Sequence, residues 1–447
     1  MPKIKKIALI LPRGKIYKYK TGAFGKYIRY APLTMQTLAA LIPPEMNIDV
    51  TVYDEGVETF RKENIKADLV GVTAITGTST RAYLYADYFR SIGVPVVIGG
   101  VHATLLPEEA MQHADAIATG IATENWPMLL RDFETGNMKR RYDQSNNVNF
   151  AGWPAPKRQV YDDKKIRFIT INSVQATYGC TNRCEFCVTP YSCKGYHHRP
   201  IPEVIEEIKL IKNKHILFVD PSPIEDRRYA IDLFKALIPL KKKWVGCSTL
   251  RIAFDDELLD MAAKSGCKGL LIGFESVTDE VLLKIHKDFN DPGKFYLASK
   301  KLHAKGISIM ACFVFGLDGD DKNVFKRTVD FINKADIDLP RFTVATPFPS
   351  TLYYKKMENA GRIIERNWEL YDCQHVVIQP KLMSPEELQE GERWAWREVY
   401  KPSSIAHRLS GSKCFLGVSL LSNFTYRTYA YNLPRFTKKE MLDNSDI

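Results

Sequence analysis

Short apolar segments alternate with helical segments in two separate runs of this sequence. In the first run, residues 1 to about 136, the apolar segments are β-branched, as strands buried on both faces should be. The expected strands are Ile7–Leu11, Ile48–Tyr53, Leu69–Ile75, Val94–Ile98 and Ala116–Ala118, and the expected helices are Pro32–Leu41, Thr80–Ser91, Pro107–His113 and Asn125–Phe133. This order predicts an α/β fold that begins with a doubly wound, Rossmann-like parallel sheet.

The second run of alternation extends from residue 166 to about residue 351, after a polar, proline-containing stretch at 137–165 that we expect to be a linker. Its expected strands are Val174–Thr177, Ile216–Val219, Trp244–Ser248, Gly269–Phe274, Ile307–Phe315 and Phe342–Thr346. Helical segments separate these strands, and six strands with helices between them predict an open, partial (βα)6 barrel.

The remaining residues, 352–447, lose the alternation and are expected to form a helical C-terminal cap. Ser384-Pro385-Glu386-Glu387 is a good helix start, with Ser384 as the N-cap and Glu387 at the third position. The 447-residue chain has an ordinary globular composition and a formal charge of +11. No uncharged apolar run approaches the ~20 residues that a spanning helix needs, so we expect a cytoplasmic protein.

Three of the nine cysteines lie close together in Cys180-Thr-Asn-Arg-Cys184-Glu-Phe-Cys187, after the first expected barrel strand. Three thiolates from one short loop can hold three irons of a [4Fe-4S] cluster and leave the fourth iron open to an external ligand. The alternative is a zinc site, which normally needs four ligands; Cys193, His197 or His198 could complete it.

This C-x3-C-x2-C spacing, with Phe186 just before the third cysteine, resembles the radical S-adenosylmethionine (SAM) enzymes. Further similar segments are Gly273-Phe274-Glu275-Ser276, Phe315-Gly316 and Thr346-Pro347. The resemblance implies that Cys180, Cys184 and Cys187 bind the cluster, whose open iron binds SAM. Electron transfer would then cleave SAM to methionine and a 5′-deoxyadenosyl radical that abstracts hydrogen from a substrate.

The same resemblance implies a set of SAM contacts at the mouth of the barrel. Glu275 would accept hydrogen bonds from the ribose hydroxyls, unless it is a salt-bridged side chain. Ser248 and Arg251 follow the preceding strand, and Arg251 would pair with the methionyl carboxylate, unless it is only an exposed loop residue. The adenine would be contacted by Phe186, Gly316 and Pro347.

The carboxyl ends of three N-terminal strands carry polar and glycine residues, where open α/β sheets bind ligands. This layout resembles the cobalamin-binding domains that precede radical SAM barrels. The residues implied as cobalamin contacts are Asp54, Glu55, Thr73, Thr76, Gly77, Gly99, Gly100, Val101 and His102. The cobalt-ligating pattern Asp-x-His-x-x-Gly is absent, so we expect His102 to be a loop or supporting residue rather than a cobalt ligand.

Together these features resemble the cobalamin-dependent radical SAM superfamily, which includes methylases and the anaerobic Mg-protoporphyrin ester cyclase group. The function that this implies is methylation of an unactivated carbon through a 5′-deoxyadenosyl radical and methylcobalamin. The alternatives are an oxidative cyclisation or rearrangement with the same cofactors, a radical SAM enzyme without cobalamin, and a non-catalytic, zinc-bound protein that binds RNA or another ligand.

The implied partners are a small-molecule or lipid substrate and a low-potential electron donor of the flavodoxin or ferredoxin type. Aromatic residues alternate with Lys and Arg near the C-terminus, from Tyr400 to Phe436. This pattern is compatible with peripheral membrane contact. We expect no nucleic acid partner.

Overall fold

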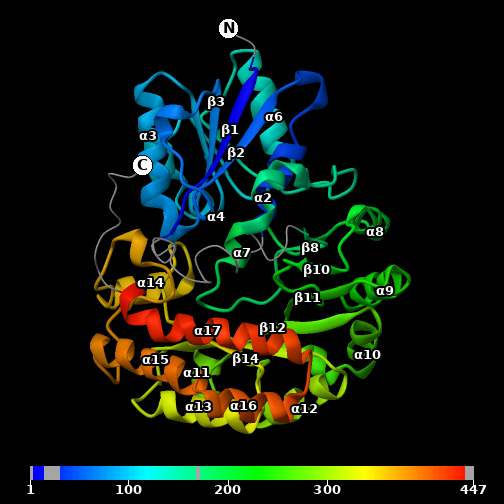
Figure 1. Cartoon of the computed structure of the whole chain (residues 1–447). Helices are drawn as coiled ribbons and strands as arrows, with labels where there is room; N and C mark the ends of the chain where they lie inside the picture. The colour runs from blue at the N-terminus through cyan, green and yellow to red at the C-terminus, as the bar shows by residue number, and fades with distance from the viewer. Residues whose placement is uncertain (1–3, 15–30, 168–171, 438–447) are drawn as a thin grey trace.

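Two six-stranded parallel sheets organise the computed structural model, which describes residues 4–14, 31–167 and 172–437. The first sheet lies above the second in Figure 1, and helices surround both. The α/β class, with a Rossmann-like sheet followed by an open barrel of βα units, agrees with the sequence analysis.

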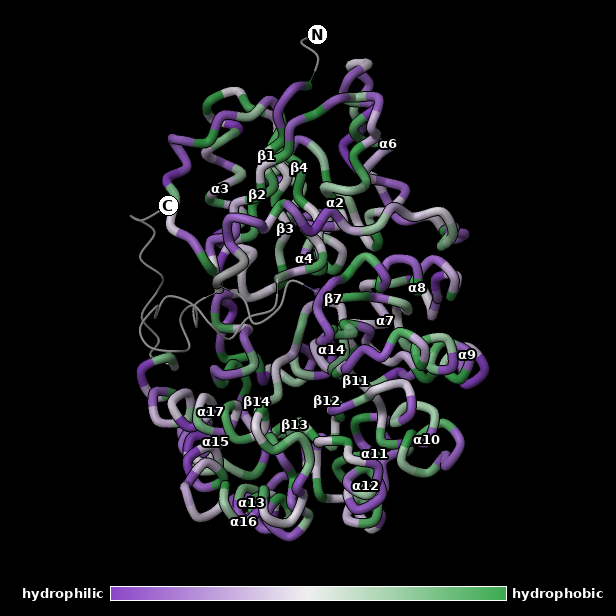
Figure 2. Tube along the Cα trace, turned by 45° about the vertical axis from the view of Figure 1, so that its right-hand side comes forward, coloured by the Kyte–Doolittle hydropathy of each residue, from purple (hydrophilic) through white to green (hydrophobic). Residues whose placement is uncertain are grey.

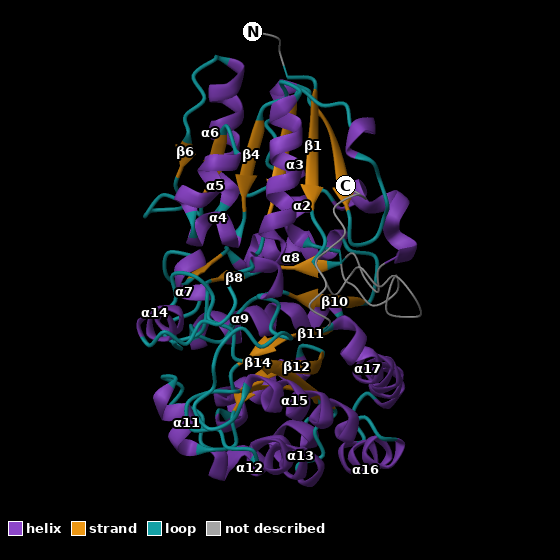
Figure 3. Cartoon of the chain, turned by 90° about the vertical axis from the view of Figure 1, so that its left-hand side faces the viewer, coloured by secondary structure: helices purple, strands orange, loops and turns teal. Residues whose placement is uncertain are grey.

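The N-terminal sheet has the strand order β2-β1-β3-β4-β5-β6, and all of its strand pairs are parallel. Its strands are β1 (Lys6–Leu11), β2 (Asp49–Asp54), β3 (Leu69–Thr73), β4 (Val96–Gly99), β5 (Ala116–Ala118) and β6 (Arg141–Tyr142). Its helices are α2 (Leu33–Ala40), α3 (Ser79–Ser91), α4 (Val101–Leu105), α5 (Pro107–His113) and α6 (Ala122–Glu134), with 3-10 turns η2 (Pro44–Met46), η3 (Lys62–Asn64), η4 (Thr76–Thr78) and η5 (Arg158–Arg167). Figure 3 shows β1 and β4 pointing toward the second sheet, so the carboxyl edge of the first sheet faces the barrel.

Alternate residues of β1 and β3 enter two different apolar cores, one on each face of the N-terminal sheet. Leu9 and Leu69 pack in one core with Trp126 of α6, whereas Ile10 and Val70 pack in the other. Burial on both faces explains why these strands are continuously apolar in sequence. Figure 2 shows hydrophobic residues gathered along the strands of this sheet.

The second sheet has the order β14-β13-β12-β11-β10-β7 and is also parallel throughout. Its strands are β7 (Ser173–Val174), β10 (His215–Phe218), β11 (Lys243–Ser248), β12 (Cys267–Glu275), β13 (Ser308–Phe315) and β14 (Leu339–Val344). The helices and turns along it are α7 (Thr189–Ser192), α8 (Ile201–Leu210), α9 (Arg227–Leu237), η6 (Ile238–Leu240), η7 (Leu250–Phe254), α10 (Asp256–Lys264), α11 (Asp279–Lys284), α12 (Pro292–Ala304) and α13 (Val324–Lys334). Because the sheet does not close on itself, it is a partial barrel.

The C-terminal part is helical and packs beside β14. It contains α14 (Leu352–Asn359), η8 (Trp368–Leu370), α15 (Pro385–Val399), α16 (Pro402–Ser412) and α17 (Leu416–Phe436). Ser384 caps α15 through a capping box with Glu387, as the sequence predicts. Within the described ranges, no helix combines the length and the apolar character needed to cross a bilayer.

Two local features differ from the expected elements. The expected strand Val174–Thr177 divides into β7 and β8 (Thr177–Tyr178), and β8 pairs antiparallel with β9 (His197–His198). The chain bends because the buried Asp220 carboxylate accepts hydrogen bonds from the amides of Ala176 and Thr177, at 3.0 and 2.5 Å. In the expected linker, β6 extends the first sheet, and Tyr161 is buried in one of its cores.

The N-terminal domain makes direct contacts with the barrel and with the C-terminal part of the chain. Helix α7, which follows the cysteine loop, packs against α4 at the carboxyl edge of the N-terminal sheet. Ser350 Oγ donates to the Leu105 carbonyl at 2.7 Å, and Trp368 Nε1 donates to the Glu109 carboxylate at 3.1 Å. The edge where the Rossmann-like sheet would bind a ligand therefore lies beside the cysteine loop.

Candidate active site

Backbone hydrogen bonds to α14 and to the loop after α11 hold the cysteine loop, which lies between β8 and α7. The Glu185 amide donates to the Ile285 carbonyl after α11, at 3.1 Å, and the Glu185 carbonyl accepts from the Tyr353 amide of α14, at 3.0 Å. The Cys187 amide donates to the Cys184 carbonyl at 3.1 Å and forms a tight turn between these two residues. These bonds fix the loop without using any of the three thiols.

Cys180, Cys184 and Cys187 are free, partly buried thiols. The pKa of Cys184 is raised to about 11, mainly by burial; Lys287 opposes this shift, and the neighbouring Cys187, Glu275 and Cys180 contribute to it. The three thiols therefore lie close enough for Cys180 and Cys187 to affect the pKa of Cys184. In the part of the chain that the structure describes, no three His, Cys, Asp or Glu side chains are arranged around a single metal ion.

This set of donors is compatible with an iron–sulfur cluster, because each cysteine of such a cluster binds a different iron. Cys180 lies in a polar environment, where Asn182 Nδ2 donates to its sulfur at 3.3 Å and to Glu225 Oε1 at 2.9 Å. Ser222 Oγ also donates to Glu225 at 2.5 Å. Glu225 and Asn182 therefore orient the Cys180 side of the loop.

Glu275 ends β12 and forms a buried ion pair with Lys287, whose Nζ lies 2.5 Å from Oε1. Burial alone would lower the pKa of Lys287, but the Glu275 carboxylate raises it above its ordinary value, helped by Cys184 and Cys187. Glu275 has a φ of 65°, a left-handed conformation that is uncommon for a residue with a side chain. The backbone and the ion pair together hold this carboxylate beside the cysteine loop.

Gly273 provides the space that the ion pair occupies. A Cβ at this position would lie 2.7 Å from Lys287 Nζ and even closer to Glu275 Oε1. Residues 273 and 275 belong to the same strand, so the Glu275 side chain folds back over the backbone of Gly273. Only glycine leaves room for that arrangement.

The other residues expected to contact SAM follow the same edge of the second sheet. Ser248 ends β11, and its Oγ donates to the Thr249 carbonyl at 3.1 Å. The Gly316 amide, after β13, donates to Asp320 Oδ2 at 3.0 Å, and Pro347 is buried after β14. Because these strands are parallel neighbours, their carboxyl ends place Ser248, Glu275, Gly316 and Pro347 at one edge.

The two remaining expected SAM contacts differ in exposure. Phe186 is half-buried and packs against the core of the barrel. Arg251 is exposed, and its guanidinium lies over the Phe289 ring, 4.4 Å from the centroid. Arg251 is therefore accessible, and Phe289 positions its guanidinium.

The residues expected to contact cobalamin form one group and one separate pair. The group lies at the ends of the adjacent strands β3 and β4 and contains Thr73, Thr76, Gly77, Gly99, Gly100, Val101 and His102. Gly100 has a φ of 95°, and a Cβ there would lie 2.6 Å from Thr73 Oγ1. Glycine thus permits the close crossing of the β3 and β4 ends.

Asp54 and Glu55 lie apart from that group. Asp54 ends β2 and Glu55 follows it. Because β1 lies between β2 and β3, this pair is roughly 10 Å from the end of β3 and roughly 14 Å from the end of β4, at 4.8 Å per strand. Glu55 is buried and accepts a hydrogen bond from Arg81 Nε at 2.8 Å, while Asp54 Oδ1 accepts from the Gly56 amide at 2.9 Å. Both carboxylates are engaged within the N-terminal domain.

His102 is fully buried in a polar network at the junction with the C-terminal part. Its Nδ1 lies 3.3 Å from Thr76 Oγ1, and its Nε2 lies 3.2 Å from Glu109 Oε1. Glu109 also accepts from Tyr83 and Trp368. Both ring nitrogens therefore have partners within the protein.

A family model for the radical SAM superfamily matches residues 174–332, which include the cysteine loop, Glu275 and Lys287. Over 391 residues the chain is 31% identical to bacteriochlorophyllide d C-12(1)-methyltransferase of Chlorobaculum tepidum, and the match covers 85% of each protein. This chain belongs to the radical SAM superfamily. It is therefore an enzyme, and the relatives that it matches are methyltransferases.

A second relative, bacteriochlorophyllide d C-8(2)-methyltransferase of the same organism, is 30% identical and covers 84% of this chain and 87% of its own length. The radical SAM methyltransferase TsrM from Kitasatospora setae, solved with cobalamin and a [4Fe-4S] cluster bound, has the same fold. Its TM-score is 0.70 at 15% identity, with 97% of this chain and 100% of the other covered. Family, enzyme class and fold therefore agree with the sequence analysis, and the zinc-bound binding protein is excluded.

Two residues beside the cysteine loop and one at the edge of the N-terminal sheet have no clear signal in the sequence. Lys287 lies in the loop after α11, and nothing in its local pattern separates it from an exposed lysine. Glu225 lies one residue before Asp226, the N-cap of α9. Ile75 is 61% exposed at the ligand edge of the N-terminal sheet, and an alternation pattern cannot show that exposure.

Proposed function

We propose that this enzyme transfers a methyl group to an unactivated carbon of a small-molecule or lipid substrate, using both cofactor sites across one cavity. The observation that supports it is the packing of α7 against α4, which places the loop of Cys180, Cys184 and Cys187 beside the carboxyl edge of the Rossmann-like sheet. When bound, the cluster and SAM supply a 5′-deoxyadenosyl radical, and methylcobalamin supplies the methyl group that replaces the abstracted hydrogen.

In this proposal the protein positions the reactants. The three cysteine thiolates bind the cluster irons. Glu275 accepts hydrogen bonds from the ribose hydroxyls of SAM at carboxylate positions that Lys287 does not occupy. Lys287 neutralises a carboxylate that would otherwise stand as an isolated buried charge. Arg251, Ser248, Phe186, Gly316 and Pro347 complete the SAM site, and each of these roles is a proposal.

Cobalamin is proposed to lie against the ends of β3 and β4. The partly exposed backbone of Gly99 and Gly100 allows a close approach, and Ile75 offers an apolar contact for a flat macrocycle. Because both nitrogens of His102 are engaged, we propose that no histidine from this turn ligates the cobalt. Asp54 and Glu55 would act indirectly, through the loop that they hold.

Anaerobic reconstitution with iron, sulfide and hydroxocobalamin tests the cofactor assignment. We expect about four irons and one cobalt per chain after desalting. C184A should lose the cluster, whereas C193A, which removes a neighbouring thiol outside the three-cysteine motif, should keep it. Four irons without cobalt would refute the methyl-transfer mechanism while keeping the radical enzyme.

Product mass then separates the reactions. Because the relatives act on bacteriochlorophyllide d, that chlorin is the first substrate to test. With CD3-labelled SAM, a labelled methyl gain supports methylation, whereas a loss of hydrogens supports the alternative, an oxidative cyclisation or rearrangement. We also propose a cytoplasmic location, a flavodoxin- or ferredoxin-type donor and a peripheral membrane contact.

A further inference from the structure

The outer face of α17 carries an apolar stripe that folding leaves uncovered. Leu416, Leu420 and Phe424 follow one another at intervals of four residues, so their side chains lie on the same face of the helix. Leu420 is 46% exposed, Phe424 55% and the adjacent Leu421 70%. A contiguous exposed apolar patch usually marks an interaction site.

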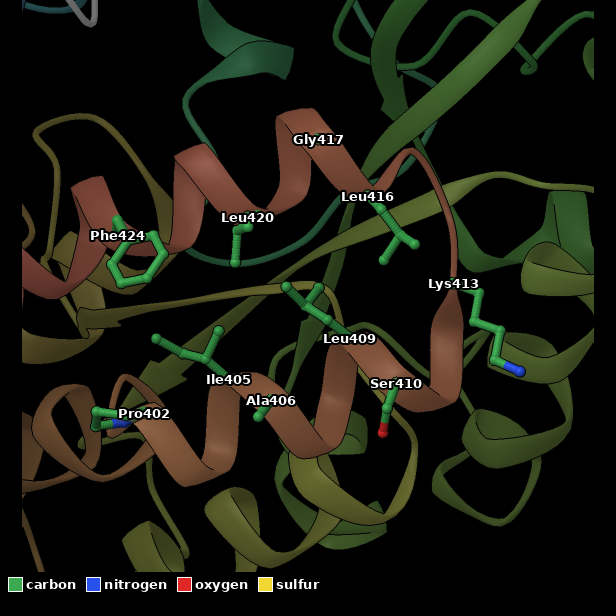
Figure 4. A pocket seen from close by; sticks show the side chains of 10 residues that line it. All are labelled: Pro402, Ile405, Ala406, Leu409, Ser410, Lys413, Leu416, Gly417, Leu420 and Phe424. Carbon is green, nitrogen blue, oxygen red and sulfur yellow. The ribbon is translucent and has the colours of Figure 1, made fainter.

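An apolar groove runs between this stripe and α16. Figure 4 shows side chains of α16 and α17 facing each other across it, with Lys413 at the turn between the helices. The groove has a volume of about 690 Å³. It is lined by Pro402, Ile405, Ala406, Leu409, Ser410, Lys413, Leu416, Gly417, Leu420 and Phe424. The two helices thus offer one continuous apolar surface.

The charge of this segment is entirely positive. No acidic residue occurs between Glu398 and Glu440. Of the basic residues in and beside α16 and α17, Arg408 is buried and Lys401 pairs with Glu398, which leaves Lys413, Arg427 and Arg435 for the surface. Arg427, Tyr431 and Arg435 continue the face of Phe424 toward the C-terminal end of α17, at intervals of three and four residues. Arg427 lies over the Tyr431 ring, 4.5 Å from its centroid. The stripe is therefore apolar at one end and cationic and aromatic at the other.

We propose that the α16–α17 surface binds the face of an anionic lipid bilayer. Apolar side chains beside cations, with no acidic residue among them, match the acyl boundary and the anionic headgroups of such a membrane. A symmetric contact with a second copy would place Lys413, Arg427 and Arg435 of both copies together without a compensating carboxylate. Charge therefore favours the lipid surface over self-association.

The opposite face of α17 lies against the barrel. The Arg341 guanidinium of β14 lies over the Tyr426 ring of α17, 5.9 Å from its centroid, and Trp396 of α15 stacks on the same ring. The helix that would contact lipid therefore also packs beside the strand next to β13. A bilayer bound at the outer face would bring apolar substrates close to the barrel. The membrane contact itself does not depend on the proposed methyl transfer.

Co-sedimentation of the full-length reconstituted enzyme with sucrose-loaded vesicles tests this surface. We expect binding to vesicles of phosphatidylcholine and phosphatidylglycerol in equal parts, and at least tenfold weaker binding to pure phosphatidylcholine. L420E/F424E should reduce binding at least tenfold, and K413E should reduce only the preference for anionic vesicles. L210E, which adds a single glutamate at an exposed leucine of α8 and so matches each of these substitutions in kind, should bind like the wild type.

Absence of binding to the anionic vesicles would overturn the proposal, as would equal binding by L420E/F424E. A change of oligomeric state in L420E/F424E without vesicle binding would assign the surface to a second copy instead. Circular dichroism melting confirms that each variant is folded. SAM cleavage measured without vesicles reports the proposed function separately, so failure of one inference is distinguishable from failure of the other.

Discussion

Gly273→Ala changes the candidate SAM site by a single methyl group. The added Cβ would lie 2.7 Å from Lys287 Nζ and closer to Glu275 Oε1, whereas ordinary contacts begin at 3.4 Å. Both side chains must therefore move by roughly 1 Å, and a displacement of that size at a reacting site can cost ~100-fold in rate. We expect SAM cleavage to fall by about 100-fold, which corresponds to about 2.7 kcal/mol.

Protein stability should change little in the same variant, because the displaced atoms are the ends of flexible side chains. Gly→Ala also reduces the entropy of the unfolded chain, which stabilises a protein by about 0.4–1 kcal/mol where the backbone tolerates it. Loss of activity without loss of folding would show that the position of the Glu275–Lys287 pair, and not the strand itself, is what matters.

The assay is formation of 5′-deoxyadenosine from SAM by the reconstituted, dithionite-reduced enzyme, normalised to iron content. Gly269→Ala is a matched control on the same strand, because its Cβ would meet its nearest neighbour, Val245, at an ordinary 3.4 Å. It should keep wild-type activity. Activity of G273A within threefold of the wild type, or an equal loss in G269A, would refute the reasoning.

Three further substitutions test other parts of the structure. Lys287→Met leaves the Glu275 carboxylate buried without its cation, so the free energy of unfolding should fall by about 3–5 kcal/mol in urea melts, and an unchanged midpoint would contradict this. Ile75→Glu should lower the cobalt retained after desalting without changing the iron content. Burial raises the pKa of Asp320 from 3.8 to about 7, so the folded state binds this proton more tightly than the unfolded state does. The stabilisation that this group gives is present below pH 4 and is lost as the pH rises through 7. Asp320→Asn should therefore flatten the fall in melting temperature between pH 5 and pH 8, and an unchanged slope would assign that fall to other groups.

Periodicity and turn chemistry predicted most of the fold because they are local. Buried parallel strands are apolar at every position, and Ser384 and Asp226 cap their helices with the side chains that the sequence shows. The two-residue strand β6 was missed, because Arg141–Tyr142 has no apolar alternation and its pairing with β5 is a tertiary effect. The bend after Val174 was missed for a related reason: it depends on Asp220, a residue from a different strand end.

The residues of the candidate site also fall into two groups: those that belong to a local sequence pattern and those whose position depends on tertiary contacts. The cysteine spacing and the glycine after β13 are local patterns, so the sequence could offer them as site residues, and their roles stay predictions. Lys287 acquires its role only when the loop after α11 returns to the end of β12, and a pattern of adjacent residues cannot show this. Ile75 is similar, because its 61% exposure depends on which side of the sheet edge faces the barrel.

His102 illustrates how a missing motif and a structural contact support the same conclusion. The sequence lacks an aspartate two residues before this histidine, so no local acceptor would orient the ring toward a cobalt ion. In the structure the acceptor is Glu109, one helix later, which is also held by Trp368 from the C-terminal part of the chain. The ring is thus turned into the junction between the two halves of the protein. To ligate cobalt it would have to break a buried hydrogen-bond network and leave Glu109 with one partner fewer, which costs free energy that a water ligand would not. Its contacts join the carboxyl edge of the N-terminal sheet to the C-terminal part of the chain, and we propose that this supporting role is the function of the histidine.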